Sequence, residues 1–248
     1  MKRVAALYDV HGNLPALEAV LGEAETDGVD LLVFGGDVAW GPLPRETLEM
    51  LMRLDRPARF VMGNADSQLV RIWDEHALGE HPLGESEEWI WLQLDREHRD
   101  FLAGFEPLLR AEVDGLGEVL FRHGSPRSET EIVTAGTPAH LLDEMLREAG
   151  ADLAVIGHTH MQFDRSGAGG RIVNAGSVGM PYGEPGAHWA MLGPDVDLRR
   201  TNYDRDQAAE RIRRGGWPGA EEFARENVLS VPAAEVAVGQ FERMAGRA

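Results

Sequence analysis

The chain has 248 residues, no cysteine, and 42 acidic against 24 basic side chains, for a formal net charge of −18. Without cysteine it can form no disulfide, thiolate nucleophile or Cys-based zinc site, so His, Asn and carboxylate side chains must hold any metal. The acidic excess argues against a nucleic acid polymer or an anionic membrane as a partner. The length suits one large α/β domain, and we expect a single domain over residues 1–248.

The sequence carries no sign of a membrane anchor or export signal. No apolar run approaches the roughly 18 residues of a membrane span, and the first residues, "MKRVAALYDVHG", turn polar too early for a signal peptide. We therefore expect a soluble, cytoplasmic protein that acts on a small molecule. The oligomeric state cannot be inferred from these features.

The first part of the chain alternates strand-like and helical patterns. "HGNLPALEAVLGEAETDG" has helical apolar spacing, and "PRETLEMLMRL" has Pro44 near its start, where proline is favoured. Buried strands are predicted around these helices at residues 3–10, 30–38 and 58–66. Residues 67–110 have helical spacing and no strand-like run, so a helical insertion is predicted there.

Strand patterns return in the second half of the chain. Short Gly/Pro turns between the last strands suit antiparallel pairing, so we predict mixed sheets in an α/β fold. The segment 205–246 is charged and helical, apart from the break "GGWPG", and is expected to close the fold. The strands predicted here are residues 118–124, 151–158, 170–177, 188–193 and 196–203.

Polar residues beside glycine follow five of the predicted strands. The carboxyl ends of strands in an open α/β sheet face one crevice, so residues distant in sequence can converge there. Left unpaired, such buried groups would cost roughly several kcal/mol, and divalent cations would satisfy them. Seven donors exceed the needs of one ion, and their types favour Mn, Fe, Zn, Co or Ni over Ca or Mg. The seven are Asp9, His11, Asp37, Asn64, His123, His158 and His160.

The blocks "DVHGN", "GGDV", "GNAD", "RHGSP" and "GHTH" resemble, in this order, the signature of the calcineurin-like metallophosphoesterases, in particular the small bacterial and archaeal phosphodiesterases. With the late block "NAGSVG", the resemblance runs from Asp9 to Ser177. It implies a four-layer α-β-β-α sandwich of two mixed β-sheets and a dinuclear metal site. In that site Asp9, His11 and His160 would bind the first ion, Asp37 would bridge, and Asn64, His123 and His158 would bind the second.

The activity that the resemblance implies is hydrolysis of a phosphodiester by a hydroxide that bridges two divalent ions, with Mn the first choice. The catalytic candidates are Asp37, His11 and Asp66. Three further residues are candidates for contact with a substrate. Asn13 precedes a helix whose N-terminus could receive a phosphate, Arg127 could hold a phosphate through two hydrogen bonds, and Asn174 would shape the site without binding metal.

Two positions depart from the family pattern. Tyr8 stands where serine is common and would alter the pocket wall. Ala65 stands where many members have a histidine that protonates the leaving oxygen. Asp66 or His11 could replace that histidine, as could His76 or His81 from the insertion, or the substrate could have a good leaving group that needs little protonation.

Two other functions fit the same sequence. The first is hydrolysis of nucleotides or dinucleoside polyphosphates, with the tryptophans of the insertion, such as Trp89, as a wall for the base. The second is a non-catalytic scaffold that keeps the fold, which Ala65 favours and the intact ligand set opposes.

Overall fold

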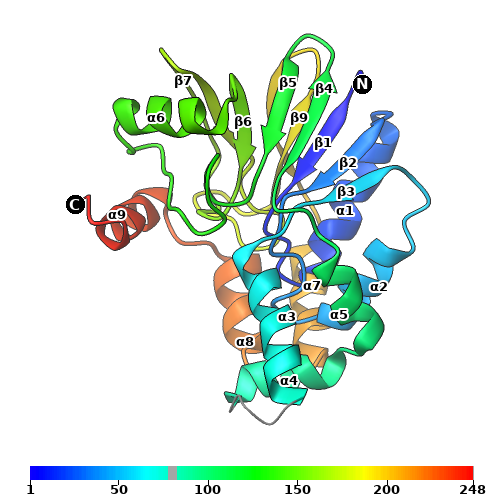
Figure 1. The fold of residues 1–248 in the computed structure, drawn as a ribbon. Coiled ribbons are helices and arrows are strands. Elements are labelled where there is room, and N and C mark those ends of the chain that lie inside the picture. Colours follow the sequence, from blue (N-terminus) through cyan, green and yellow to red (C-terminus); the bar gives the residue numbers. More distant parts are fainter. Residues whose placement is uncertain (78–82, 248) are drawn as a thin grey trace.

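Two five-stranded mixed sheets form the centre of the computed structural model, which describes residues 1–77 and 83–247 (Figure 1). In the first sheet, of order β10-β9-β1-β2-β3, the strands β1, β2 and β3 run parallel while β9 and β10 are antiparallel to their neighbours. Its strands are β1 (Val4–Leu7), β2 (Leu31–Phe34), β3 (Ala58–Phe60), β9 (Ala187–Leu192) and β10 (Val196–Thr201).

The second sheet has the order β4-β5-β6-β8-β7. Its inner strands β5, β6 and β8 are parallel, and the two edge strands pair antiparallel with their neighbours. The strands are β4 (Leu109–Val113), β5 (Gly117–Phe121), β6 (Leu153–Ile156), β7 (Phe163–Gly167) and β8 (Gly170–Asn174).

An apolar core joins the inner faces of the two sheets. Val33 of β2, Phe121 of β5 and Val155 of β6 belong to this one buried cluster. Tyr8 lies in the same cluster, fully buried, and its hydroxyl donates a hydrogen bond to the carbonyl of Val155 at 2.8 Å. The expectation that Tyr8 lines the pocket is therefore wrong, because its ring fills the space between the sheets.

Helices cover the outer faces, which completes the four predicted layers. α1 (Leu14–Thr26) and α2 (Pro44–Met52) bury their apolar faces in the core outside the first sheet, through Leu17 and Leu48. α6 (Ala139–Ala149) packs outside the second sheet through Met145. The α-β-β-α sandwich inferred from the sequence is confirmed.

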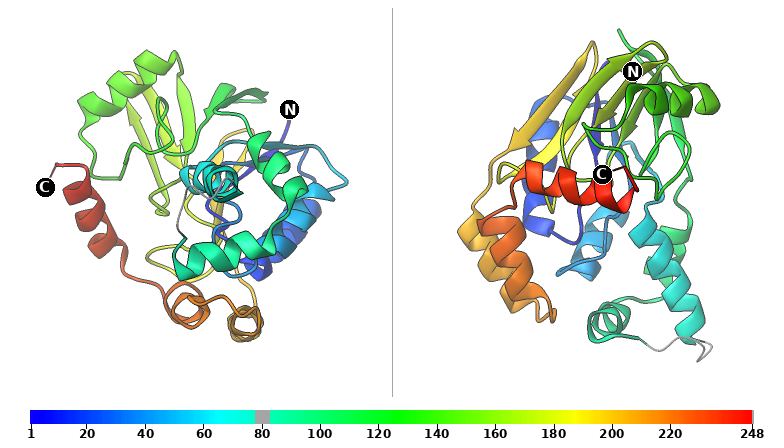
Figure 2. Two further views of the ribbon diagram at one scale, coloured as in Figure 1. Left: turned by 60° about the horizontal axis from the view of Figure 1, so that its bottom comes forward. Right: turned by 90° about the vertical axis from the view of Figure 1, so that its left-hand side faces the viewer.

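Two helical groups lie beyond the same end of the sheets (Figures 1 and 2). The region of the predicted insertion holds α3 (Asn64–Ala77), α4 (Glu85–Gln93) and α5 (Arg96–Ala103). The C-terminal segment holds α7 (Arg205–Arg214), α8 (Ala220–Phe223), the π-helix η1 (Ala224–Leu229) and α9 (Ala234–Met244). His81 lies outside the described residues.

All eight predicted strands are present, although several are shorter than predicted, and two strands were missed. β4, "LRAEV", begins at the end of the predicted helical insertion, and its charged residues separate its apolar ones. β7, "FDRSG", has one large apolar residue and pairs at the edge of its sheet.

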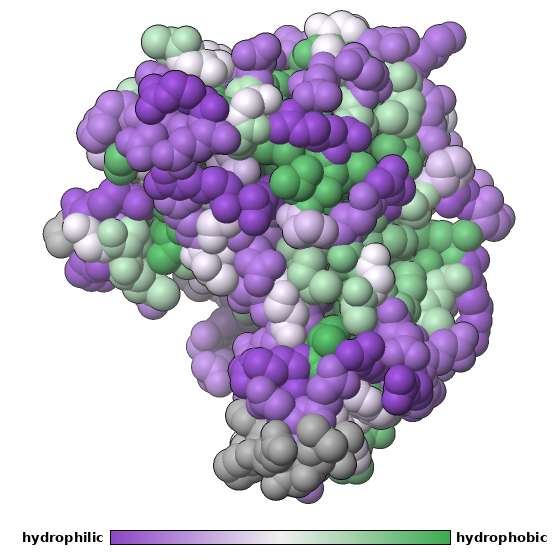
Figure 3. All heavy atoms as spheres, viewed as in Figure 1, coloured by the Kyte–Doolittle hydropathy of each residue, from purple (hydrophilic) through white to green (hydrophobic). Residues whose placement is uncertain are grey.

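Among the described residues, no helix is long and apolar enough to cross a membrane. The face in Figure 3 is mainly hydrophilic.

Candidate metal centre

The seven predicted ligands converge at the carboxyl ends of the strands. Asp9 and His11 follow β1, Asp37 follows β2, and the two histidines of "GHTH" follow β6 of the other sheet. The side chains form two groups, each with its donor atoms within 4.8 Å of one another. The first group is Asp9, His11 and His160, and the second is Asp37, His123 and His158. The division matches the one that the sequence motifs implied.

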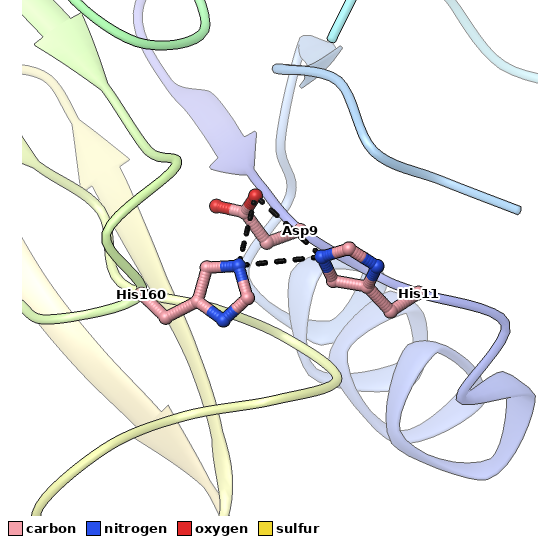
Figure 4. A group of neighbouring side chains, drawn as sticks. All are labelled: Asp9, His11 and His160. Atoms are coloured by element: carbon pink, nitrogen blue, oxygen red, sulfur yellow. Dashed lines mark hydrogen bonds and ion pairs between the residues drawn. The ribbon is translucent and has the colours of Figure 1, made fainter. Parts of the chain in front are cut away.

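The first group brings three donor atoms to one point (Figure 4). Asp9 Oδ1 lies 3.3 Å from Nε2 of His160 and 3.9 Å from Nε2 of His11. The two Nε2 atoms are 3.3 Å apart. Donors that share one ion at bond lengths of 2.0–2.2 Å are about 3–3.5 Å apart. Two of the three separations, both 3.3 Å, lie in this range and the third, 3.9 Å, is slightly longer, so the group suits a single transition metal.

One oxygen of Asp37 faces both groups. Its Oδ2 atom lies 3.3 Å from Nε2 of His123 in the second group and 3.8 Å from Nε2 of His11 in the first. Its Oδ1 atom accepts a hydrogen bond from the backbone N–H of Ala65 at 2.7 Å. Asn64 adds its Oδ1 at 3.1 Å from Nε2 of His123. Asp37 is thus placed between the two candidate ion positions.

Backbone carbonyls orient three of the histidines. Nδ1 of His11 bonds to the carbonyl of Trp40 at 3.0 Å, and Nδ1 of His160 to that of Met180 at 2.9 Å. Nδ1 of His123 bonds to the carbonyl of Gly35 at 2.8 Å. Because a carbonyl can only accept, each Nδ1 must carry the hydrogen, which leaves Nε2 of each ring directed at the centre.

The backbone is strained at five of the seven positions. Among the described non-glycine residues, the ones with a positive φ angle are these five ligand candidates. The left-handed conformation costs an ordinary residue about 1–2 kcal/mol. Such strain persists at functional sites because the surrounding structure enforces it. The residues are Asp9 (54°), His11 (47°), Asp37 (54°), His158 (66°) and His160 (59°).

Each group contains one histidine that holds a proton strongly and one that does not. Although burial opposes it, the charges of Asp37 and Asp9 raise the pKa of His123 to about 10. Burial and the charge of His123 lower the pKa of His158 to about 4. In the first group the pKa of His160 is raised, against burial, by Asp9, whereas burial and His160 lower the pKa of His11. Without metal, a proton on His123 supplies positive charge in the second group, and the raised pKa of His160 favours a proton in the first.

The donor set fits two divalent cations. Asp9 Oδ1 is fully enclosed and has no hydrogen-bond partner. Nε2 of His11 and Nε2 of His160 face each other at 3.3 Å, so a cation, either a proton or a metal ion, must lie between them. Both conditions are met by a transition metal bound to carboxylate and imidazole. The residues therefore fit the ions that the sequence motifs implied.

Comparison with known proteins agrees with this geometry. The sequence model of the calcineurin-like phosphoesterase superfamily domain matches residues 2–195. The chain belongs to the calcineurin-like phosphoesterase superfamily. A metallophosphoesterase of Sphaerobacter thermophilus has a similar structure, with a TM-score of 0.70 and 29% identity, over 90% of this chain and 97% of that one.

Two relatives resemble this calcineurin-like phosphoesterase in sequence. The "Uncharacterized protein MJ0912" of Methanocaldococcus jannaschii is 26% identical over 87% of this chain and 93% of its own length. A symmetrical bis(5'-nucleosyl)-tetraphosphatase of Baumannia cicadellinicola subsp. Homalodisca coagulata is 27% identical over 56% of this chain and 48% of its own. The first similarity must extend beyond the family domain into the C-terminal helices.

Asp66 braces the backbone of the phosphoesterase centre. Its carboxylate is fully buried and accepts hydrogen bonds from the backbone N–H groups of Asp37 (2.7 Å), Val38 (3.0 Å) and Gly63 (3.2 Å). Burial and the charge of Asp37 raise its pKa to about 7. Every hydrogen bond described for Asp66 goes to backbone, which suits support of Asp37 better than the predicted proton donation to a leaving group.

Arg127, a candidate for contact with a substrate phosphate, is paired with three carboxylates of the protein itself. Its guanidinium contacts Glu131 at 2.8 Å, Glu144 at 3.2 Å and Glu148 at 2.6 Å. Three carboxylates satisfy its charge and use all but one of its five N–H donors, so it cannot hold a substrate phosphate through two hydrogen bonds in this arrangement. The arginine ties the loop after β5 to α6.

Asn13 and Asn174 are also committed to the protein itself. Asn13 Oδ1 caps α1 by accepting from the N–H of Ala16, and its Nδ2 donates to the carbonyl of Gly179. Asn174 donates to the carbonyl of Gly157 and the hydroxyl of Thr159, within "GHTH". Both are fully buried. Substrate contact by either residue is thus not supported, whereas Asn174 does shape the loop.

The motif pattern did not connect Met180 or Trp217 with His160, whereas Tyr182 was a candidate for contact with a nucleotide base. The ring of Tyr182 stacks near that of His160, with 6.0 Å between centroids, and Met180 supplies the carbonyl described above. Trp217, from the "GGWPG" break, lies with Met180 and Tyr182 on one cavity wall. Aromatic residues beside Gly/Pro turns were the available signal, but a turn alone gave no reason to connect them with the centre.

Proposed function

We propose that this protein is a phosphodiesterase that uses two divalent transition-metal ions, with Mn first among Mn, Fe, Zn, Co and Ni. The observation that carries the proposal is the position of Asp37 Oδ2 between two His/carboxylate groups. Asp9, His11 and His160 would hold one ion and Asn64, His123 and His158 the other, with Asp37 shared. The substrate would be a small phosphorylated molecule.

The side chains divide the work around the reacting phosphate. Two ions at this centre would activate the attacking water and neutralise charge on the transferring phosphoryl group. Asp37 fixes the spacing of the two groups, and Asp66 holds the backbone by accepting from the N–H groups of Asp37 and Val38. The carbonyls behind the histidine rings keep each Nε2 directed inward.

Position 65 cannot donate a proton to the leaving group of the ester. Ala65 has no titratable side chain, Asp66 bonds to backbone, and His11 has Nδ1 occupied by Trp40 and Nε2 in the ligand set. His76 packs its ring edge-on against Trp91 in the insertion, with 4.6 Å between centroids. We therefore infer a preference for esters whose leaving groups are acidic enough to depart as anions.

The decisive test combines metal content with activity. Metal analysis by mass spectrometry and hydrolysis of bis-p-nitrophenyl phosphate are measured on one Mn-loaded preparation. We expect two ions per chain and turnover, both reduced in Asp37→Asn and retained in the matched surface control Asp55→Asn. A metal-replete protein that cleaves neither activated monoesters nor diesters would overturn the proposal and leave the scaffold alternative.

A second candidate is hydrolysis of nucleotides or dinucleoside polyphosphates, which the tetraphosphatase relative favours. The insertion gives this candidate little support, because Trp73 and Trp91 pack against each other at 5.6 Å and Trp89 packs on the core. Tyr182, beside His160, is better placed. A nucleotide panel on wild type, Trp89→Ala and Tyr182→Ala separates the two sites, and unchanged kinetics in both variants would remove the reason for this candidate.

A further inference from the structure

The C-terminal helix α9 is attached to the rest of the protein largely through one carboxylate. The helix lies apart from α7 and α8 (Figure 1), and within it only Ala237 is buried, while Val236 and Met244 are each 66% exposed. The side chain of Glu242, in contrast, is 12% exposed and accepts hydrogen bonds from Nε and Nη2 of Arg247, both at 2.8 Å. The attachment of α9 therefore depends strongly on Glu242.

Glu242 holds a turn in the loop between β5 and α6. Its Oε1 atom accepts a hydrogen bond from the hydroxyl of Thr134 at 2.6 Å. Arg247 donates to the hydroxyl of Thr137 at 3.2 Å and to the carbonyl of Ile132 at 3.0 Å. Both threonines are buried, although the chain between β5 and α6 forms no helix or extended strand. α9 thus supplies support that this loop does not obtain from a sheet or a helix of its own.

One peptide group of this turn faces the loop "GHTH". The N–H of Thr134 donates to Oγ1 of Thr137 at 2.9 Å. The carbonyl of Val133 belongs to the same planar peptide group and accepts from the hydroxyl of Thr159 at 3.0 Å. Val133 and Thr159 are fully buried, so the bond between them is shielded from water. The orientation of this peptide group therefore links α9 to "GHTH".

Thr159 separates two histidines that belong to different candidate ion groups. His158 and His160 both have positive φ angles, and such strain persists only where neighbouring contacts enforce it. The hydroxyl of Thr159 makes two such contacts, because it donates to Val133 and accepts from Nδ2 of Asn174 at 3.1 Å. Loss of the Val133 contact would leave a buried donor unpaired and the strained loop less firmly held.

α9 also reaches the other side of His160. Phe241 packs edge-on against Tyr182, with 6.2 Å between ring centroids, and Tyr182 in turn stacks near the ring of His160. The N–H of Gly183 donates to the carbonyl of Pro232, just before α9, at 2.9 Å. The segments on both sides of His160 therefore rest on this helix or on the residues that lead into it.

We propose that Glu242 is a positioning residue for the metal centre. It acts through the turn at Thr134 and the hydroxyl of Thr159 on the two histidines of "GHTH". The inference rests on the proposed two-metal phosphodiesterase for its first test. A glutamate that only anchored α9 would influence Tm alone, whereas a positioning glutamate influences the affinity for metal as well.

The first test is a double-mutant cycle on Mn affinity, measured by calorimetry. Thr159→Val removes the hydroxyl at nearly constant shape, and we expect Mn binding to weaken about tenfold or more. Glu242→Gln should weaken Mn binding about tenfold in the wild type but less than twofold in Thr159→Val, where the connection is already broken. Thr159→Ser keeps the hydroxyl, so its affinity should stay within about threefold of the wild type.

Two variants of α9 serve as controls. Glu235→Gln makes the same chemical change at an exposed position of the helix. Ala237→Gly weakens the helix without removing a side-chain hydrogen bond. Both should bind Mn as the wild type does, although Ala237→Gly should lower Tm. If Ala237→Gly and Glu242→Gln weaken Mn binding equally, or if Glu242→Gln costs as much in Thr159→Val as in the wild type, the inference is overturned while the phosphodiesterase stands.

Hydrogen exchange on the metal-free protein separates this inference from the proposed function, because it requires neither metal nor substrate. The N–H of His158 donates to Oδ2 of Asp9 at 2.9 Å, and that of Thr159 to the carbonyl of Gly157 at 2.7 Å. We expect both N–H groups to exchange about tenfold faster in Glu242→Gln, with α1 unchanged.

Faster exchange that is confined to α9 would overturn the inference, even if the wild type binds Mn and cleaves diesters. If the wild type binds no Mn, the proposed function fails and the exchange rates alone decide the inference.

Discussion

The loops of the candidate metal centre and the C-terminal helical segment are built by different physical means. The loops hold fully buried charges on strained backbone, with Asp9 and Asp37 at positive φ, directly after strands. The segment around Trp217 presents an aromatic wall and exposed carboxylates from short helices and a π-helix. Strand ends supply reactive groups at fixed spacing, whereas the helical segment supplies shape.

This difference has a consequence for mutagenesis. A change in a ligand, or in a side chain that supports one, alters the spacing or charge of the ligands, so it should affect every substrate to the same degree. Position 65 differs, because a histidine there would add a proton donor without altering the ligands. A change in the segment around Trp217 leaves the ligands in place, so it should affect some substrates and spare others. Substitutions in and near the ligand loops are expected to have the following effects, from the largest to the smallest.

The largest effect is expected from Ala65→His. A histidine there would supply the missing proton to the leaving oxygen, and general acid catalysis contributes about 10²–10⁴-fold. We expect kcat/KM to rise about hundredfold for alkyl diesters and little for p-nitrophenyl esters. Metal content and circular dichroism serve as controls for the fold. An equal change for both ester classes would show that proton transfer is not what position 65 lacks.

Asp66→Asn should weaken metal binding for all substrates. An amide keeps one acceptor oxygen but turns its NH2 group toward the backbone N–H of either Asp37 or Val38, because these bond to different oxygens of Asp66. Loss of such support typically costs about 10–100-fold in metal affinity or activity. Calorimetric titration with Mn measures the effect, with Asp55→Asn as control. Unchanged affinity together with lost turnover would instead assign Asp66 a direct part in proton transfer.

The stability of the metal-free protein should fall as pH rises from 7 to 9. The pKa of His123 is about 10 in the folded protein and about 6.5 in an unfolded chain, so its proton stabilises the fold at low pH and is lost as pH rises. The raised pKa of His160 acts in the same direction. We expect Tm to drop by about 5 °C or more.

The same Tm series with Mn should be nearly flat, because a metal ion replaces the proton in each group. His140→Gln replaces an exposed histidine on α6. Without metal, its Tm should fall with pH as steeply as that of the wild type. A slope that persists unchanged with bound metal would place the titrating group outside the centre.

Arg127→Met should have the smallest effect on catalysis. Because its guanidinium is bound by three glutamates, removing it should lower Tm but leave kcat/KM within about twofold for every diester. A loss of more than tenfold in kcat/KM, with metal content unchanged, would restore Arg127 as a phosphate-binding residue.

The sequence predicted the layers of the fold and the grouping of Asp9, His11 and His160, because each ligand follows a strand at a short, regular spacing. It did not predict what the buried polar residues beside them do. Asn13 could cap a helix or face a substrate, and only the position of Gly179, distant in the chain, decides between these roles. Trp217 was predicted only as part of the break "GGWPG", because the residues that it lies beside, Met180 and Tyr182, are distant in the chain.

The left-handed ligands also bear on how this fold can change in evolution. Glycine adopts that conformation without the steric cost, so replacing His158 or His160 by glycine would relieve about 1 kcal/mol at each position. Catalysis and stability therefore oppose each other at the same five residues. A lineage released from selection for activity would gain stability as its ligands were replaced, and recovery of the centre would require several unfavourable steps in succession.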